Sequence, residues 1–541
     1  MVLQETEPKN PQLPFHSNPD ILDEICEYLH DEQDTQLDAE AARVSRRNLL
    51  WVALTCKAFL EPALDRLWRS LDSLFPLLRI LPSFTQSDET YVSFFFLASY
   101  PPDEPLSLFI FYRKVLRGNV TAEDWARFDW YARRIRKFCY TRDPDHLDIA
   151  MHVYFRIAQL RSTPLLPSLR HLHCPSTSQN DFLISGICLF LSPSLQTLQL
   201  ENISNVEDKL CGTVLHTLAT DGAQIEKIIL RGRGLSKDTV WMAIRFEHLN
   251  SLELSGMGEA VNLEVVDKIG SLPWLVNLAI DFTDSSMAPL AQDIGLKDLN
   301  SLMITAPAPF IQALLSHIST TQLETFVAVV PSNPPADKKE FLTNVVDRWK
   351  ATLRRIALVH QQLEEAAVEH LHIDALAPLV PLRKLTYLRL EGYAIELTDE
   401  NMSEMAMAWP EMDTLLLPFI SAIHPRPTIA SLRIFADRCP SLRYLTIPLN
   451  TGDLQPFVSA GVPHTPVHNL HTLTIASAND PWDLRDLLHL ARHIDYLFPR
   501  LKSLFPYEGN DVDRWVQVHD MIQMYQAVRQ EAIIFNSAKI R

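Results

Sequence analysis

The stretch LNSLEL, residues 249–254, places apolar side chains at its first, fourth and sixth positions, and it returns as LVNLAI at 275–280 and LNSLMI at 299–304. The same phrase begins at residues 135, 169, 195, 225, 323, 353, 385, 412, 442, 470 and 501. Successive starts in mid-chain are 24 or 26 residues apart, and later intervals run from 27 to 32 residues. A short apolar phrase arises by chance, but near-constant spacing indicates a repeat array.

Each repeat is predicted to hold one short strand and one helix. Residues two apart share a face of a strand, and helical apolar spacing follows, as in Val261, Val265, Val266 and Ile269. One such unit cannot bury its own apolar side, so neighbouring units must complete the core. The predicted fold is therefore α/β, with short parallel strands stacked from 135 to 506 and helices on the outer face.

This pattern resembles the leucine-rich-repeat superfamily in an irregular form. The Asn or Cys that the family places shortly after each strand is mostly absent, so no continuous Asn ladder is expected. The varying repeat length predicts uneven curvature. The alternative is a plain α/β or α/α solenoid in which the phrases are chance matches.

Bulk properties exclude several classes of protein. The 541 residues exceed what one compact core accommodates, and a net charge of −17 disfavours nucleic-acid and anionic-membrane binding. Seven scattered cysteines without a CxxC pair predict reduced thiols. No apolar run reaches about 18 residues, and the N-terminal residues lack a signal-peptide pattern. The expected localisation is cytoplasmic or nuclear.

A small helical module is predicted at 19–75, after a lead at 1–18 that is expected to be disordered. It consists of PDILDEICEYL at 19–29 and LLWVALTCKAFLEPALDRLWRSL at 49–71, each with apolar residues at helical spacing. Pro62 is expected to break or restart the second helix. A bundle this small cannot bury all of its apolar surface alone.

These two segments resemble an F-box, in the version common in mushroom-forming fungi. The three sub-motifs are Pro19 to Ile25, Cys56 to Phe59 and Ala63 to Trp68, and the polar insert between Leu29 and Leu49 is longer than usual. The resemblance implies binding to a Skp1-type adaptor and through it to a cullin. The matched positions that would face the adaptor are Pro19, Ile21, Leu22, Ile25, Leu29, Leu49, Val52, Cys56 and Trp68. The alternative is a helical cap that packs on the first repeat.

Two further regions complete the domain plan. A connecting region at 76–134 is expected to contain a helix at 122–134, which begins after Thr121 with an acidic first turn, and a β-hairpin from the runs at 91–98 and 106–112. Residues 507–541 are predicted to form a C-terminal capping helix, because a terminal repeat needs a cover.

The alternate strand positions predict which side chains face a partner on the concave surface. Arginine and tyrosine are favoured in protein interfaces, and they cluster in the later strands as Arg354, Arg355, Tyr387, Arg389, Arg443 and Tyr444. We expect this group to help hold a protein with acidic character, although a hydrated strand surface explains it equally well.

No catalytic, phosphate-loop or zinc motif occurs in the sequence. His171 and His173 share a strand face, but no third and fourth ligand is evident, so no metal, cofactor or catalytic residue is predicted. The predicted function is a non-enzymatic substrate-recognition adaptor of a Skp1–cullin–F-box ubiquitin ligase. Two alternatives remain: a protein-binding scaffold without a ubiquitin-ligase role, and an enzyme or GTPase regulator built on repeats.

Overall fold

The computed structural model describes residues 19–29, 39–86, 114–140, 149, 151–175, 186–256, 263–282, 293–331, 337–361, 369–417, 426–451, 468–477, 483–506 and 512–539. The chain divides into two compact units, Met1–Leu249 and Asn250–Arg541, which are described separately. The lead at 1–18 and the runs at 91–98 and 106–112 lie outside the described residues.

The first unit contains a parallel sheet whose strands follow one another in chain order. These strands are β1 (Ser70–Leu71), β4 (Lys137–Cys139), β5 (His171–Cys174), β6 (Thr197–Leu200) and β7 (Lys227–Arg231). A separate antiparallel pair joins β2 (Phe84–Gln86) to β3 (Lys114–Leu116), the strands on either side of the region predicted to hold a hairpin. The sheet begins at β1, inside the range assigned to the helical module.

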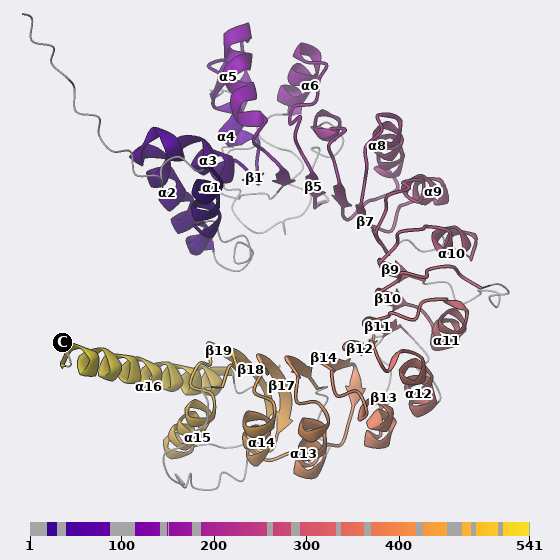
Figure 1. The fold of residues 1–541 in the computed structure, drawn as a ribbon, viewed down its shortest axis with the longest axis vertical. Coiled ribbons are helices and arrows are strands. Elements are labelled where there is room, and N and C mark those ends of the chain that lie inside the picture. Colours follow the sequence, from indigo (N-terminus) through magenta and orange to yellow (C-terminus); the bar gives the residue numbers. More distant parts are fainter. Residues whose placement is uncertain are drawn as a thin grey trace, which may run out of the picture. The chain divides into compact units, whose positions relative to one another are not determined.

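The helices after the N-terminal module lie on one side of this sheet (Figure 1). The helices of this unit are α1 (Pro19–Tyr28), α2 (Ala39–Thr55), α3 (Lys57–Leu67), α4 (Phe75–Leu78), α5 (Ala122–Ala132), α6 (Met151–Leu160), η3 (Ile187–Phe190), α8 (Asp208–Thr220) and α9 (Lys237–Ala243). α5 starts as predicted, because the Thr121 side chain accepts the backbone N–H of Asp124 in a capping box. The break between α2 and α3 falls at Cys56, and Pro62 lies inside α3, so the predicted break at Pro62 is wrong.

The second unit has the same arrangement of parallel strands in chain order, with more strands. Its parallel strands are β8 (Ser251–Ser255), β9 (Asn277–Asp281), β10 (Ser301–Thr305), β11 (Thr325–Val330), β12 (Arg355–His360), β14 (Tyr387–Glu391), β16 (Thr414–Leu416), β17 (Tyr444–Leu449), β18 (Thr472–Ser477) and β19 (Ser503–Pro506). A short parallel pair, β13 (Glu369–His370) and β15 (Tyr393–Ala394), lies apart from this sheet.

The helices of the second unit cover one face of its sheet and leave the other face open (Figure 1). They are α10 (Leu263–Gly270), α11 (Ala308–His317), α12 (Lys338–Trp349), η5 (Ile373–Leu379), α13 (Asp399–Ala408), α14 (Ala430–Arg438), α15 (Leu484–Leu497) and α16 (Val512–Lys539). α16 packs on β19 and α15 and buries Trp515, Val518 and Ile522, as expected of a helix that covers the last strand.

The core lies between sheet and helices because the strands alternate. In β14, Leu388 and Leu390 are buried while Tyr387, Arg389 and Glu391 are half-buried, and other strands repeat this alternation. Full burial of one leucine side chain contributes about 1.5–3 kcal/mol. Every predicted phrase coincides with a strand, which confirms the α/β class and contradicts the α/α alternative.

One backbone carbonyl accepts two N–H groups at most strand entries. The carbonyl oxygen of Arg354 accepts the N–H groups of both Thr386 (2.8 Å) and Tyr387 (3.2 Å) in the next strand. The carbonyl of Asn250 does the same for Val276 and Asn277. The pattern recurs in both units, and because two donors meet one acceptor, a slip of one residue disrupts this pair of bonds and turns the buried side chains to the open face.

Candidate functional site

The N-terminal helices form a small core of their own. Cys26 and Leu49 are fully buried together with Ala53 and Ala63, and Phe59 packs against them. This core joins α1, α2 and α3 at their shared centre. Arg66 on α3 adds a charged link, because its guanidinium donates to Asp23 on α1 at 2.7 Å.

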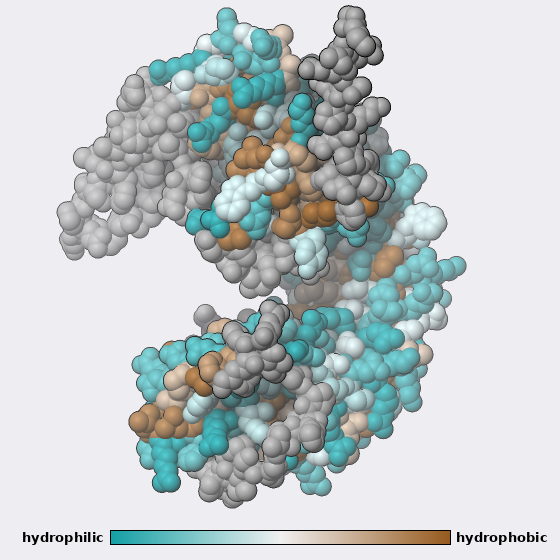
Figure 2. All heavy atoms as spheres, turned by 60° about the vertical axis from the view of Figure 1, so that its left-hand side comes forward, coloured by the Kyte–Doolittle hydropathy of each residue, from teal (hydrophilic) through white to brown (hydrophobic). Residues whose placement is uncertain are grey.

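Large apolar side chains remain exposed on the outside of the same helices. On α2, Leu50, Trp51 and Leu54 follow helical spacing and are 46%, 58% and 74% exposed. On α1, Ile25 and Tyr28 flank a cavity of about 320 Å³ that is lined by Ile21, Glu24, Ile25, Tyr28 and Leu29. Figure 2, which brings these helices forward, shows hydrophobic residues gathered over them between hydrophilic ones. We call these five exposed residues the module surface; groups of this kind mark interaction sites in soluble proteins.

The positions expected to face an adaptor fall into two groups. Ile25 and Cys56 are exposed, and Ile21 is half-buried beside the α1 cavity. Others are buried or half-buried by the chain itself: Leu22, Leu29, Leu49, Val52 and Trp68. Pro19 is the first residue of α1. The pattern missed the exposed Trp51 and Leu54, although their spacing from Leu50 was visible in the sequence.

The end of α3 is attached to α5. The rings of Trp68 and Tyr131 lie 4.6 Å apart between centroids. Arg134 forms ion pairs with Glu61 and Asp65 on α3, and its guanidinium lies 4.2 Å from the ring centroid of Trp130. Burial by itself lowers the pKa of Arg134, but the hydrogen bonds that its guanidinium donates to the Glu61 and Asp65 carboxylates outweigh burial, so the pKa is raised.

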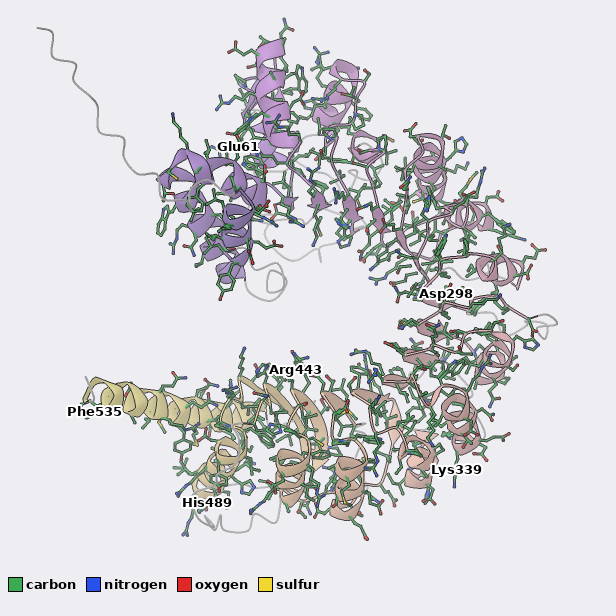
Figure 3. All side chains as sticks on the ribbon, viewed as in Figure 1. Glu61, Asp298, Lys339, Arg443, His489 and Phe535 are labelled. Atoms are coloured by element: carbon green, nitrogen blue, oxygen red, sulfur yellow. The ribbon has the colours of Figure 1, made fainter. Side chains whose placement is uncertain are left out.

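The arginines and tyrosines predicted on the concave surface lie together on the open face of the second unit. Arg355 pairs in register with Tyr387, and Thr414 stands between Tyr387 and Tyr444. The hydrogen bonds of the strand entries place Arg354 and Arg443 in the row before, with Thr386 and Asp413 between them. Arg389 lies two residues after Tyr387 on the same strand and pairs in register with Leu416. In Figure 3 Arg443 projects from the open face, whereas His489 lies on the helix side.

Carboxylates on the same face neutralise part of this positive charge. Arg389 donates to Glu391, and Arg443 pairs with Asp413; these contacts raise the pKa of both arginines, against partial burial. Arg355 instead stacks on Tyr387, at 4.3 Å from its guanidinium to the ring centroid. Glu391 was not predicted to belong here, although alternation places it two residues after Arg389.

The described residues contain no group of three or more His, Cys, Asp and Glu side chains arranged to hold a metal ion. His171 and His173 both lie on β5, and His173 Nδ1 is 2.9 Å from Cys139 Sγ. Burial lowers the pKa of His173, with Glu201 opposing it. In the part of the chain that is described, no helix combines the length and apolar character needed to cross a bilayer.

Comparison with known protein families and with curated proteins found no match. No protein-family model matches the sequence, and no curated protein is similar enough to suggest common descent.

Proposed function

We propose that this protein is a non-catalytic adaptor that docks on a Skp1-type partner through its N-terminal helices and holds a target protein on its repeats. In this proposal the chain is the substrate-recognition subunit of a Skp1–cullin–F-box ubiquitin ligase, and its repeats are an irregular form of the leucine-rich repeat. It would do no chemistry itself and would raise the effective concentration of the target near a ubiquitin-loaded enzyme.

The observation that carries the proposal is the module surface. Three helices held by their own core still leave Leu54 at 74% and Tyr28 at 92% exposure. Exposed aromatic and aliphatic anchors of this size favour a helix-in-groove or helix-on-helix partner. The residues of the F-box resemblance lie in these same helices, and the exposed Ile25 belongs to both sets.

The open face of the second unit offers the surface for a target. Arg355 adds positive charge to the row that contains Tyr387 and Tyr444, and Arg354 and Lys502 add it to the row before, within a chain of net charge −17. A partner segment that carries carboxylates would complement this row and would compete with Glu391 and Asp413 for their arginines.

One observation favours the scaffold without a ubiquitin-ligase role. Trp68, expected to face an adaptor, packs against Tyr131 of the same chain with the two rings tilted by 43°, and Arg134 links α3 to α5. A helical cap that protects the first strand of the sheet would show these contacts. It would not need Leu54 and Tyr28 to be exposed, and for this reason we favour the adaptor.

The two functions are separated by capture of purified Skp1 with the full chain. We expect wild-type protein to bind Skp1 and the Ile25→Asp, Leu54→Asp double variant to lose binding to background. A matched control, Val206→Asp with Leu484→Asp, changes two exposed apolar residues on other helices or turns and should bind like wild type. If wild-type protein does not bind Skp1, or if the double variant binds undiminished, the adaptor proposal is wrong.

A further inference from the structure

A second cavity, unrelated to the surfaces above, opens on the sheet of the first unit. It has a volume of about 570 Å³. Its lining residues are Arg69, Arg136, Lys137, Cys139, Arg170, His171, Leu172, His173, Thr197 and Gln199. Four of these ten carry a permanent positive charge, two are histidines and none is acidic. This concentration of positive charge is the reverse of the chain's net charge of −17.

The three arginines of the lining each lie directly before one of three neighbouring strands, β1, β4 and β5. The carbonyl of Arg69 accepts the N–H groups of Arg136 (2.8 Å) and Lys137 (2.9 Å), and the carbonyl of Arg136 accepts those of Arg170 and His171 in the same way. Neighbouring strands in a sheet lie about 4.8 Å apart. The sheet therefore presents a ladder of three guanidinium groups along one edge of the cavity.

Three carboxylates of the described residues near the ladder pair with cations outside it. Asp65 pairs with Arg134, and Asp72 lies 3.7 Å from Arg46. Glu201 lies 2.8 Å from Arg231 and also 3.6 Å from His173 of the cavity lining. Within the described part of the chain, Arg136, Lys137 and Arg170 have no carboxylate at ion-pair distance. Burial and the neighbouring Arg170 and Arg69 lower the pKa of Arg136, with Asp65 opposing, so like charges crowd one another here.

We propose that this cavity binds a phosphate group. A phosphate presents several charged oxygens around one centre, so it can accept hydrogen bonds from several neighbouring guanidinium groups, more than a single planar carboxylate can. The cavity has the volume of a small-ligand site, and its open mouth also admits a phosphorylated side chain. The inference does not depend on what the N-terminal helices bind.

Calorimetric titration of the full chain tests the proposal, with inorganic pyrophosphate and a phosphoserine peptide as separate probes. We expect at least one probe to bind, and the Arg136→Gln, Arg170→Gln double variant to bind it at least about 10-fold more weakly, because each charged hydrogen bond contributes roughly a factor of ten. A matched control removes two exposed cations from the helical side, Lys209→Gln with Arg245→Gln, and should bind like wild type.

Further arms make the result decisive. If pyrophosphate binds more tightly, the source is a small molecule; if the peptide binds more tightly and its unphosphorylated form does not bind, the source is a modified protein. Arg170→Gln alone tests the ladder if the double variant fails to fold, since the Arg170 side chain is exposed. The proposal is overturned if neither probe binds to wild type, or if the ladder variants and the control lose affinity equally.

Discussion

Removal of the acidic partners of Arg134 should loosen the joint between α3 and α5. The Arg134 side chain is only 4% exposed, whereas those of Glu61 and Asp65 are 57% and 56% exposed. The Glu61→Gln, Asp65→Asn double variant keeps the shape of both side chains and leaves a buried guanidinium without a counter-charge. Loss of one partner from a fully buried ion pair costs about 3–5 kcal/mol.

The exposure of the two carboxylates reduces this cost, because water and salt already screen them. We expect a loss of about 2 kcal/mol, which raises the equilibrium constant for local opening roughly 30-fold, at about 1.4 kcal/mol per factor of ten. The stacking of Arg134 on Trp130 is unchanged by the substitution and retains part of the packing.

Hydrogen exchange followed by mass spectrometry on the full chain is the appropriate assay, because it reports local opening in a protein of two units. Peptides from α3 and α5 should exchange faster, and those from α12 should not change. The control Glu247→Gln with Asp298→Asn makes the same change in net charge at exposed positions. Unchanged exchange in α3 and α5, or an equal change in the control, would refute the reasoning.

Three further predictions follow from buried side chains of the second unit and from one exposed thiol. Trp349→Phe should lower the free energy of unfolding by about 1–2 kcal/mol in urea denaturation, because it leaves the Thr320 carbonyl without the indole N–H that now donates at 3.0 Å. A maleimide should label the exposed Cys56 in the native chain but not Cys439, because burial raises the pKa of the Cys439 thiol to about 12. Peptide mass spectrometry identifies the labelled cysteines, and labelling of Cys439 in the native chain would contradict the prediction. Burial lowers the pKa of His468, and the hydrogen bond of its ring to the Cys439 carbonyl opposes this shift. The unfolded chain, in which the pKa of this histidine is about 6.5, therefore binds the proton more readily than the folded chain. The free energy of unfolding should fall as the pH drops below 6.5, by at most about 1.4 kcal/mol per pH unit. His468→Gln should flatten this slope in unfolding curves between pH 7 and 5.5, and an unchanged slope would show that other groups dominate.

The strands were predictable because their signal is local. A leucine at the first, fourth and sixth positions, as in Leu385, Leu388 and Leu390, already determines which side chains enter the core. The α5 start was predictable for the same reason, since Thr121 and Asp124 form their capping box within one turn.

Other features depend on contacts between distant residues, and the sequence pattern could not supply them. The strand at Ser70–Leu71 has only two residues, too few to show alternation, and it is defined by pairing with Lys137 and Phe138. Periodicity also does not say which stripe of a helix is covered. Leu22 and Leu50 both lie on apolar stripes, yet Leu22 is buried and Leu50 is exposed.

The ladder of arginines was missed for a related reason. Arg69, Arg136 and Arg170 are separated by 67 and 34 residues, and the first precedes a strand, β1, that the repeated phrase does not mark. Once β1 is known, the three arginines are seen to share one position, directly before a strand. The sequence therefore contained this regularity, but it could be recognised only after all the strands had been located.

The convergence of two N–H groups on one carbonyl has a practical consequence for protein engineering. Because most strands are fixed by these bonds where they enter the sheet, we expect that residues can be added or removed in the loops of the helical side without displacing the neighbouring open-face side chains. The open face therefore offers side-chain positions at a regular spacing of about 4.8 Å, one strand apart. These positions could be substituted one at a time, while the loops of the opposite side carry tags, hinges or new domains.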